Sequence, residues 1–382
     1  MKSTRRIALC FFLVAAAYFC SSARGTSIIF PAFDTPVVQG NRVFGSYTDS
    51  DGKALLCLDM ESRAVLWRLE LPYPISDIWI TKDNRLVVRQ ENSVAVLASL
   101  TGKTLYTKPV PGPVFGMAAD GAVYCKTKEG DIVCILLDSG EERWRFNIRA
   151  PDSNIHLEYF EPFVFVLLRP RTIVSRMDGQ GNTTSMEGLN KLICLSAGNG
   201  AVLWKEDLPL SKAAFAASIQ VQGAAKWILC ATDKQVRLMD RQTGKVMRVF
   251  DSPEDINGVD FWGDKRIALC LGGFGAESRT VQILDVNNFA VQSEFSVAVD
   301  EVAFTRVVGN VLILESLYHH VGVDMVSGKV IWKVGQIWWT LHQDNLIFGG
   351  HTGGGRDMQR VLGILDPKTG KMTLLHSEEV VR

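Results

Sequence analysis

Short apolar runs alternate with polar turns along almost the whole chain. Most runs follow a turn of Gly, Asn or Asp, residues that tolerate the positive φ of tight hairpins. No helical periodicity appears outside the extreme amino terminus, so the pattern predicts an all-β chain. Eight runs are rich in β-branched and aromatic residues, as strands are, and they span residues 42–47, 85–88, 122–125, 163–168, 227–230, 266–270, 311–314 and 346–348.

A ten-residue phrase recurs after each of these runs. Two clear copies are Leu-Ser-Ala-Gly-Asn-Gly-Ala-Val-Leu-Trp, ending at Trp204, and Val-Asp-Met-Val-Ser-Gly-Lys-Val-Ile-Trp, ending at Trp332. The interval between copies is 38 to 60 residues, which suits one four-stranded propeller blade. The sequence therefore predicts an eight-bladed β-propeller, with seven blades as the alternative. The column that usually holds Gly contains Arg63, Gly102, Gly140, Gly200, Gly244, Phe289, Gly328 and Gly370.

A second column lies four residues after the first and is mostly aromatic. A flat ring that recurs once per blade is suited to fill the wedge between two twisted sheets. We therefore expect this column to pack between neighbouring blades. Its members are Trp67, Tyr106, Trp144, Trp204, Arg248, Ser293, Trp332 and Leu374.

The phrase Leu-Asp-x-x-Thr-Gly-Lys-x-x-Trp resembles the blade signature of the pyrroloquinoline-quinone (PQQ)-like propellers. That family includes the quinoprotein alcohol dehydrogenases and the outer-membrane assembly lipoprotein BamB. The resemblance covers about residues 27–382. It is specific for the fold and weak for function, because one fold hosts many functions.

The amino terminus has the pattern of a secretory signal peptide. Lys2, Arg5 and Arg6 precede an apolar stretch over 7–20, and small residues follow at 21–23. An apolar core of this length is typical of a signal and short for a membrane span. We expect residues 1–23 to be the signal, residues 24–382 to form one propeller domain, and no transmembrane segment to remain. An uncleaved anchor is the alternative.

Cys20 raises the question of a lipid anchor, because BamB is a lipoprotein. A lipoprotein signal has a small residue just before the cysteine, and Phe19 is not small. The sequence therefore favours a periplasmic or secreted protein without an anchor at Cys20.

The charge balance excludes one class of partner. Basic and acidic residues both number 41, so no electrostatic footprint for nucleic acid or an anionic membrane is present. We expect a monomer, because a closed ring exposes no free blade face.

The six cysteines outside the signal fall into repeat columns. Small buried strand positions accept Cys as a small hydrophobe, so we expect free buried thiols. Cys125 and Cys134 lie on neighbouring strands of one blade, and a disulfide between them stays an alternative. The other four are Cys57, Cys194, Cys230 and Cys270.

The resemblance to quinoproteins makes PQQ-dependent oxidation the sharpest enzymatic hypothesis. Catalytic members of the family carry adjacent cysteines, a calcium site and a catalytic Asp. This chain has no adjacent cysteines, and most of its Asp residues stand at the repeated turn. The adjacent His319 and His320 lack an evident third metal ligand, and we interpret them as a solvated loop pair. We therefore predict no enzymatic activity, no cofactor and no metal.

Candidate partner-binding residues stand where the chain departs from its period. The longest interval contains a connection over 169–190, which carries Arg169, Arg171 and Arg176. Loops on a rigid scaffold often mediate recognition. The adjacent Trp338 and Trp339 are the second departure.

These observations predict a non-catalytic propeller that binds or scaffolds protein partners of the cell envelope, as BamB does. A quinoprotein-type oxidoreductase and a small-ligand sensor that uses the central funnel are the alternatives.

Overall fold

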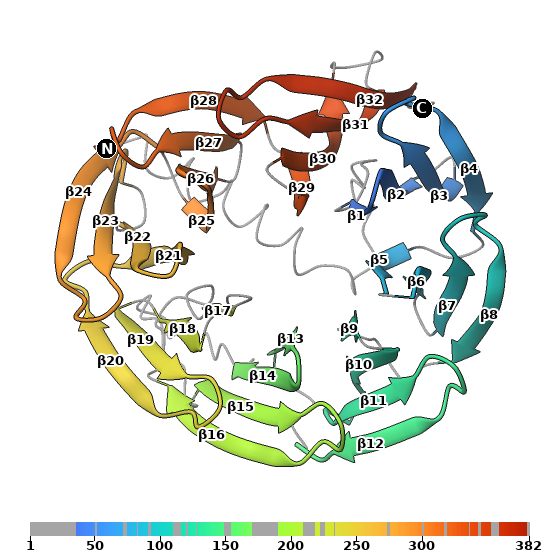
Figure 1. Cartoon of the computed structure of the whole chain (residues 1–382), viewed down its shortest axis with the longest axis horizontal. Coiled ribbons are helices and arrows are strands. Elements are labelled where there is room, and N and C mark those ends of the chain that lie inside the picture. The colour runs from blue at the N-terminus through green and yellow to red at the C-terminus, as the bar shows by residue number, and fades with distance from the viewer. Residues whose placement is uncertain are drawn as a thin grey trace, which may run out of the picture.

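A computed structural model shows a closed ring of eight four-stranded antiparallel sheets (Figure 1). The predicted all-β, eight-bladed propeller is confirmed, and no helix occurs among the residues that the structure describes. It describes 36–379 except for 50–51, 72–74, 82, 91–92, 110–115, 120, 128, 149–153, 170–189, 209–217, 222–225, 233, 273–275, 300–301, 317–318, 336, 343–344 and 353–358.

Each blade consists of four consecutive strands, with the first nearest the ring centre and the fourth at the outer rim. Blades are numbered here in chain order. The first four blades contain β1 (Val37–Gln39), β2 (Arg42–Asp49), β3 (Gly52–Asp59) and β4 (Val65–Glu70); β5 (Ile75–Ile80), β6 (Arg85–Gln90), β7 (Ser93–Ala98) and β8 (Thr104–Pro109); β9 (Gly116–Ala119), β10 (Ala122–Lys126), β11 (Ile132–Leu136) and β12 (Glu142–Phe146); and β13 (Asn154–Phe160), β14 (Phe163–Arg169), β15 (Asn190–Ser196) and β16 (Val202–Leu208).

The second half of the ring repeats the same order. Its blades contain β17 (Ser218–Val221), β18 (Trp227–Ala231), β19 (Gln235–Asp240) and β20 (Val246–Asp251); β21 (Ile256–Trp262), β22 (Arg266–Leu271), β23 (Arg279–Asp285) and β24 (Val291–Val297); β25 (Val302–Val308), β26 (Val311–Ser316), β27 (His319–Asp324) and β28 (Val330–Gly335); and β29 (Ile337–His342), β30 (Asn345–Thr352), β31 (Gln359–Leu365) and β32 (Met372–Glu379).

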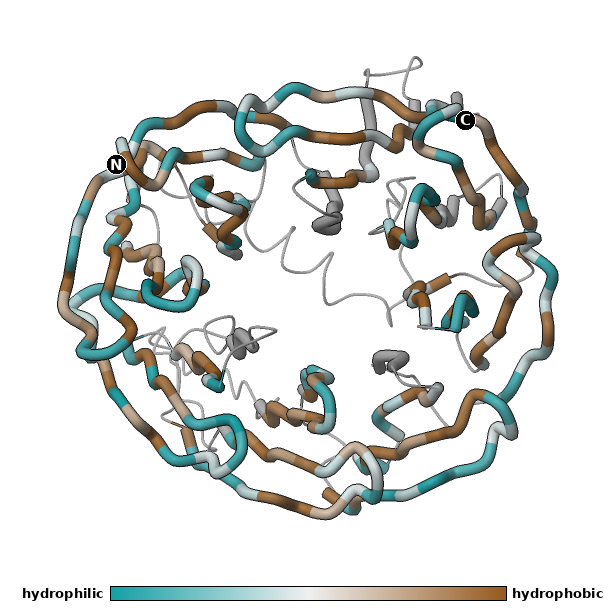
Figure 2. Tube along the Cα trace, viewed as in Figure 1, coloured by the Kyte–Doolittle hydropathy of each residue, from teal (hydrophilic) through white to brown (hydrophobic). Residues whose placement is uncertain are grey.

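The apolar runs found in the sequence are the second strands of the blades, and they are buried on both faces. In β6, for example, Leu86, Val87 and Val88 are all fully buried. Figure 2 shows the apolar stretches on the strands and the polar stretches mainly at the turns. The core is therefore a series of packed layers between blades, and each layer binds two neighbouring sheets together.

The repeated phrase forms the turn between the third and fourth strands. Its Asp side chain caps the turn: Asp240 accepts hydrogen bonds from the Thr243 amide and hydroxyl, each at 2.9 Å. The Gly-column residue then adopts a positive φ, which is 70° at Gly244. This conformation is costly for most residues but accessible to Gly.

A side chain from each outer strand covers the corresponding turn of the next blade. The indole of Trp144 packs on Gly200, and its Nε1 donates to the Ala197 carbonyl at 2.9 Å. Trp67, Trp204 and Trp332 repeat the arrangement on Gly102, Gly244 and Gly370. The predicted aromatic wedge is confirmed at these four junctions.

Three junctions use other side chains. Lys108 covers Gly140 and donates to the Ser139 carbonyl at 2.8 Å, and Phe295 covers Gly328. These residues stand two positions beyond Tyr106 and Ser293. Tyr106 packs between blades 2 and 3 as predicted, whereas the exposed Ser293 does not fill the junction of blades 6 and 7. At the fifth junction Arg248 donates through Nε to the Asn287 carbonyl at 2.8 Å.

The two exceptions to the Gly column are explained by these contacts. A Cβ on Gly200 would lie 2.7 Å from ring atoms of Trp144, so an indole on the turn requires Gly beneath it. Phe289 meets the ring of Phe250 edge-on, with the ring centroids 6.4 Å apart, and Arg63 stands at the junction of the last and first blades. Both residues keep the positive φ, at 58°.

We expect Gly200→Ala to destabilise the protein far more than Gly309→Ala. Both glycines have positive φ, but a Cβ at Gly309 meets no atom within 4 Å. Backbone strain alone costs about 1–2 kcal/mol, and overpacking adds about 1–3 kcal/mol at Gly200. Urea unfolding measures both changes, and equal losses would show that the indole contact is not what demands glycine.

The turn carboxylates make the fold sensitive to acid. Hydrogen bonds from Ser62 lower the pKa of Asp59, bonds from Ser327 lower that of Asp324, and the Thr369 hydroxyl does so for Asp366. At Asp240 burial opposes the shift, but bonds from Thr243 outweigh it and the pKa is lowered. A lowered folded pKa gives stability that is present above the unfolded value of 3.8 and is lost as the pH falls through the folded value.

We therefore expect the free energy of unfolding to decrease from about pH 5 downward. Replacing Asp59, Asp240, Asp324 and Asp366 together by Asn should flatten this dependence, because Asn does not titrate. Denaturant titrations between neutral and acid pH measure it. An unchanged slope in the quadruple variant would assign the acid sensitivity to other groups.

Candidate functional site

The junction between blade 8 and blade 1 closes the ring without a shared strand. Blade 1 is built wholly from β1–β4 and blade 8 wholly from β29–β32. Side-chain packing alone joins them: Val43, Ile347 and Leu375 form one buried cluster, and Leu56 with Leu362 belongs to another. We call this junction the closing seam.

At the closing seam the column position that holds Trp at four other junctions holds Leu374, and the neighbouring Leu375 is buried against Val43 of blade 1. In blade 8 the β-bulge lies between Leu362 and Gly363, two residues further from the turn than the bulge of every other blade. The shift turns Leu374 outward, where it is 48% exposed. The expectation that Leu374 packs between blades was therefore wrong, because the displaced bulge rotates it away from blade 1.

A cleft of about 350 Å³ occupies the closing seam. Its walls come from two turns of blade 1 and from β30 and β31 of blade 8. The residues that line it are Gly40, Asn41, Met60, Glu61, Asn345, Ile347 and Ile364. Apolar side chains and amides share the lining, and Glu61 is its single charged residue. The sequence analysis missed this site, because it depends on contact between the two ends of the chain.

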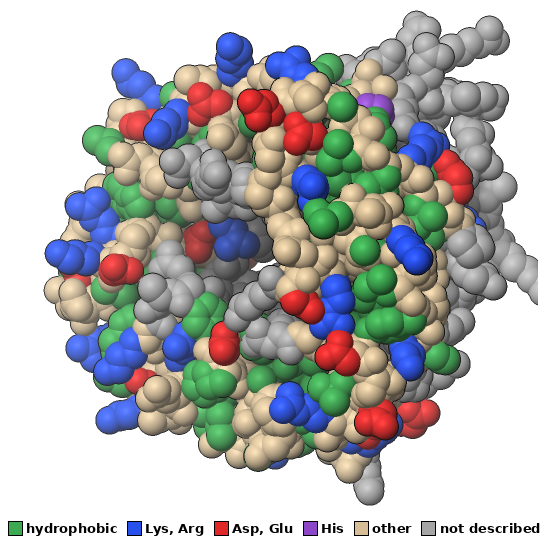
Figure 3. All heavy atoms as spheres, turned by 45° about the vertical axis from the view of Figure 1, so that its right-hand side comes forward, with side chains coloured by type: hydrophobic (Ala, Val, Ile, Leu, Met, Phe, Trp, Pro, Cys, Tyr) green, Lys and Arg blue, Asp and Glu red, His purple; other side chains and the backbone are tan. Residues whose placement is uncertain are grey.

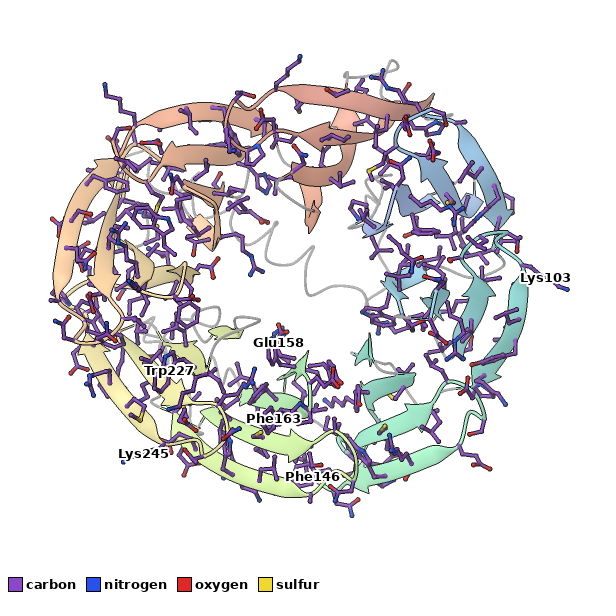
Figure 4. All side chains as sticks on the ribbon, in the orientation of Figure 1. Lys103, Phe146, Glu158, Phe163, Trp227 and Lys245 are labelled. Atoms are coloured by element: carbon purple, nitrogen blue, oxygen red, sulfur yellow. The ribbon has the colours of Figure 1, made fainter. Side chains whose placement is uncertain are left out.

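The inner strands place polar groups at the central opening. His156 and Glu158 of β13 lie 2.9 Å apart, and Figure 4 shows Glu158 on the side facing the ring centre. On β21, Asp260 is 5% exposed and accepts the Val307 amide of β25 at 2.8 Å. Burial raises the pKa of Asp260, and the charge of Arg306 opposes that shift. The bond to Asp260 joins the inner strands of blades 6 and 7, whereas His156 and Glu158 pair within one strand.

The structure does not bring the predicted partner-binding residues into one described cluster. Arg169 ends β14, whereas Arg171 and Arg176 lie outside the described residues. Trp338 and Trp339 are in β29, the innermost strand of blade 8, where they pair with Gly349 and Phe348. All five assignments stay predictions.

The six described cysteines are buried free thiols, as predicted. Cys134 belongs to the layer between blades 3 and 4, whereas Cys125 belongs to the layer between blades 2 and 3. The two point to opposite faces of one sheet and do not pair. Burial raises the pKa of Cys125 to about 12 and that of Cys134 to about 11.

The histidine pair differs from its predicted setting. His319 and His320 lie in β27, and His320 is 1% exposed with its Nε2 3.3 Å from a Glu315 oxygen. The interpretation as a solvated loop pair was wrong, because both histidines lie within a strand and His320 is buried. Among the described residues, no three His, Cys, Asp or Glu side chains gather as metal ligands would.

The outer surface carries no dominant charge. Figure 3 shows Lys and Arg interspersed with Asp and Glu and with apolar side chains over the rim. Within the described part of the chain, no helix is long and apolar enough to cross a membrane. The proposed signal over 1–23, with Cys20, lies outside the described residues.

The ring of eight four-stranded sheets with its repeated capped turn defines the chain as a β-propeller. The family model of the outer membrane protein assembly factor BamB matches residues 23–164. The resemblance predicted from the repeated phrase is thereby confirmed. A comparison with curated protein sequences gives no match.

Solved structures share the fold at low sequence identity. BamB from Moraxella catarrhalis is 12% identical, with 82% of this chain and 92% of that chain covered and a TM-score of 0.59. A europium-containing methanol dehydrogenase is 9% identical, with coverages of 85% and 84% and a TM-score of 0.58. The dihydro-heme d1 dehydrogenase NirN is 10% identical, with coverages of 90% and 75% and a TM-score of 0.61. The fold is thus shared by BamB and by dehydrogenases.

We expect the six thiols to resist modification in the native protein. Thiolate is the reactive form, and all six thiols are buried. Burial raises the pKa of Cys57, Cys125, Cys134, Cys194 and Cys270 to about 11 or 12, which disfavours their thiolates at pH 8. A chromogenic disulfide reagent should titrate no cysteine of residues 24–382 before denaturation and all six in concentrated guanidinium chloride. Rapid native reaction of one thiol would mark a reactive cysteine.

Proposed function

We propose that this chain is an exported, non-catalytic propeller that binds a protein partner in the cell envelope. The observation that carries the proposal is the match of residues 23–164 to the BamB family model. The printed name of that family describes an outer membrane protein assembly factor. The signal-like amino terminus agrees with export.

The architecture supports a binding role, because the residues that join the blades differ from the loops that a partner could contact. The repeated geometry of the turns and covering side chains joins the blades. The turns between second and third strands differ in length from blade to blade, and the connection over 170–189 between β14 and β15 is the longest of them. Variable loops on a rigid ring are suited to recognition.

A quinoprotein-type oxidoreductase is the second candidate function. The fold shared with the europium-containing methanol dehydrogenase and NirN favours it. The sequence opposes it, because the chain has no adjacent cysteines and its turn aspartates are engaged in capping. Purified protein mixed with PQQ and calcium decides the question: quinone absorbance with oxidation of alcohols or sugars would overturn the non-catalytic proposal.

Affinity capture from native envelope extracts tests the partner. The tagged protein should recover a defined protein set, identified by mass spectrometry together with bound small molecules. The double variant Arg171→Ser with Arg176→Ser should reduce recovery by about tenfold if the connection after β14 binds the partner, which corresponds to about 1.4 kcal/mol.

The control variant also loses two positive charges, but from outer strands instead of the connection after β14. Arg68 and Arg143 lie on outer strands and are exposed, and their replacement by Ser should leave recovery unchanged. Both double variants should melt like the parent protein. Repeated capture without any reproducible partner would count against the proposed function.

A further inference from the structure

The cleft of the closing seam lies between the two elements that enclose an indole elsewhere in the ring. At the junction of blades 7 and 8, Trp332 lies between Gly322 of its own blade and Gly370 of the next. The residue equivalent to Gly322 in blade 8 is Ile364, six positions before the Gly column. The turn residue equivalent to Pro367, whose carbonyl accepts the indole N–H, is Met60 of blade 1. Ile364 and Met60 both line the cleft.

Burial shows that this position is uncovered only at the closing seam. The residues equivalent to Ile364 in blades 1, 3 and 4 are Cys57, Cys134 and Cys194, and each is fully buried. In blades 2, 5, 6 and 7 the equivalent residues are also buried: Val96, Leu238, Ile283 and Gly322. Ile364 alone among the eight stays partly exposed. Ile364 therefore supplies the apolar floor of an indole site in which no indole of the described residues lies.

Arg63 determines where a ring can enter. A Cβ at the Gly-column position meets a stacked indole at under 3 Å in the four tryptophan junctions. A ring therefore cannot lie flat on Arg63. It has to enter nearer the ring centre, over Met60 and Ile364 and between Asn41 and Asn345, and the cleft opens there.

The cleft selects a particular chemistry around the ring. Its amides, on Asn41 and Asn345, supply acceptors for an indole N–H. Glu61 is exposed at the rim and is the one charged group of the lining, so it favours a cation beside the ring. An anion at the same place would be repelled.

We propose that the closing-seam cleft binds the indole of a tryptophan that stands beside a basic residue in a segment of the protein partner. The proposal rests on the proposed function for the existence of that partner. The partner's ring then supplies at this seam the contact that the chain's own outer strands supply at the other junctions.

Tryptamine tests the site itself, because it carries an indole N–H and an ammonium group. We expect saturable binding in the millimolar range, as suits so small a ligand, with shifts of the Asn41 and Asn345 side-chain amide signals in NMR spectra. Indole-3-acetate has the same ring and the opposite charge, and we expect it to bind about fivefold more weakly. Glu61→Gln should remove this preference. Absence of tryptamine binding would overturn the proposal.

A variant whose own side chain occupies the cleft tests whether the partner binds there. Ile364→Trp places an indole in the cleft and should abolish both tryptamine binding and recovery of the partner. Leu374→Trp adds the same side chain to the exposed outer face of blade 8 and should change neither. If Ile364→Trp does not melt like the parent, Glu61→Lys, at an exposed position, serves as the second variant and should lower both signals.

The outcomes separate the two proposals. If the parent protein recovers a partner and Ile364→Trp recovers it equally well, the partner's indole is not in the cleft and only this inference fails. If no partner is recovered but tryptamine binds and Ile364→Trp abolishes binding, the indole site stands and the proposed function fails. If removal of residues 24–34 strengthens tryptamine binding about tenfold or more, the chain's own amino terminus fills the cleft and the assignment to a partner is wrong.

Discussion

The contact between an outer-strand side chain and the capped turn of the next blade is the interaction on which this ring depends. It combines apolar burial, a hydrogen bond to a turn carbonyl and a close approach that only glycine permits. The same contact explains why small residues such as Cys57, Cys134 and Cys194 lie under the indoles. At Phe289 the contact differs, because Phe250 meets the Phe289 ring edge-on and no indole lies on the turn.

The contact that joins neighbouring blades is altered at one junction, the closing seam. Seven junctions join blades that are neighbours in the chain, and each has a covering side chain from the preceding outer strand. The eighth joins the chain's two ends, and there the displaced bulge of β31 and β32 and the side chain of Arg63 occur together. The displaced bulge turns the column side chain of blade 8 outward, and Arg63 replaces the glycine on which an indole lies elsewhere. A cleft with an apolar floor and a polar rim lies at this junction.

The sequence predicted the number of blades because two independent signals share one period. The apolar second strands and the Gly column each occur eight times, and both depend only on local structure. Lys108 and Phe295 were not predicted as covering residues, because their place depends on how the outer strand bends after its bulge. The exposure of Leu374 has the same cause.

Features that depend on contacts between distant residues could not be predicted from the sequence pattern. Whether a turn needs glycine is decided by a side chain about 40 residues earlier, as for Gly244 and Trp204. The opposite orientation of Cys125 and Cys134 follows from strand pairing that spacing alone leaves open. The closing-seam cleft requires contact between Met60 and Ile364, residues at opposite ends of the domain.

Construction of every blade from consecutive strands has a topological consequence. Among the described residues, no sheet contains strands from both ends of the chain. A gene rearrangement that joined the present ends and opened the chain between any two other blades would leave all eight sheets intact. It would also move the break away from the cleft. The ring therefore does not require that the chain begin at blade 1. A whole blade could be gained or lost at the closing seam without dividing a sheet.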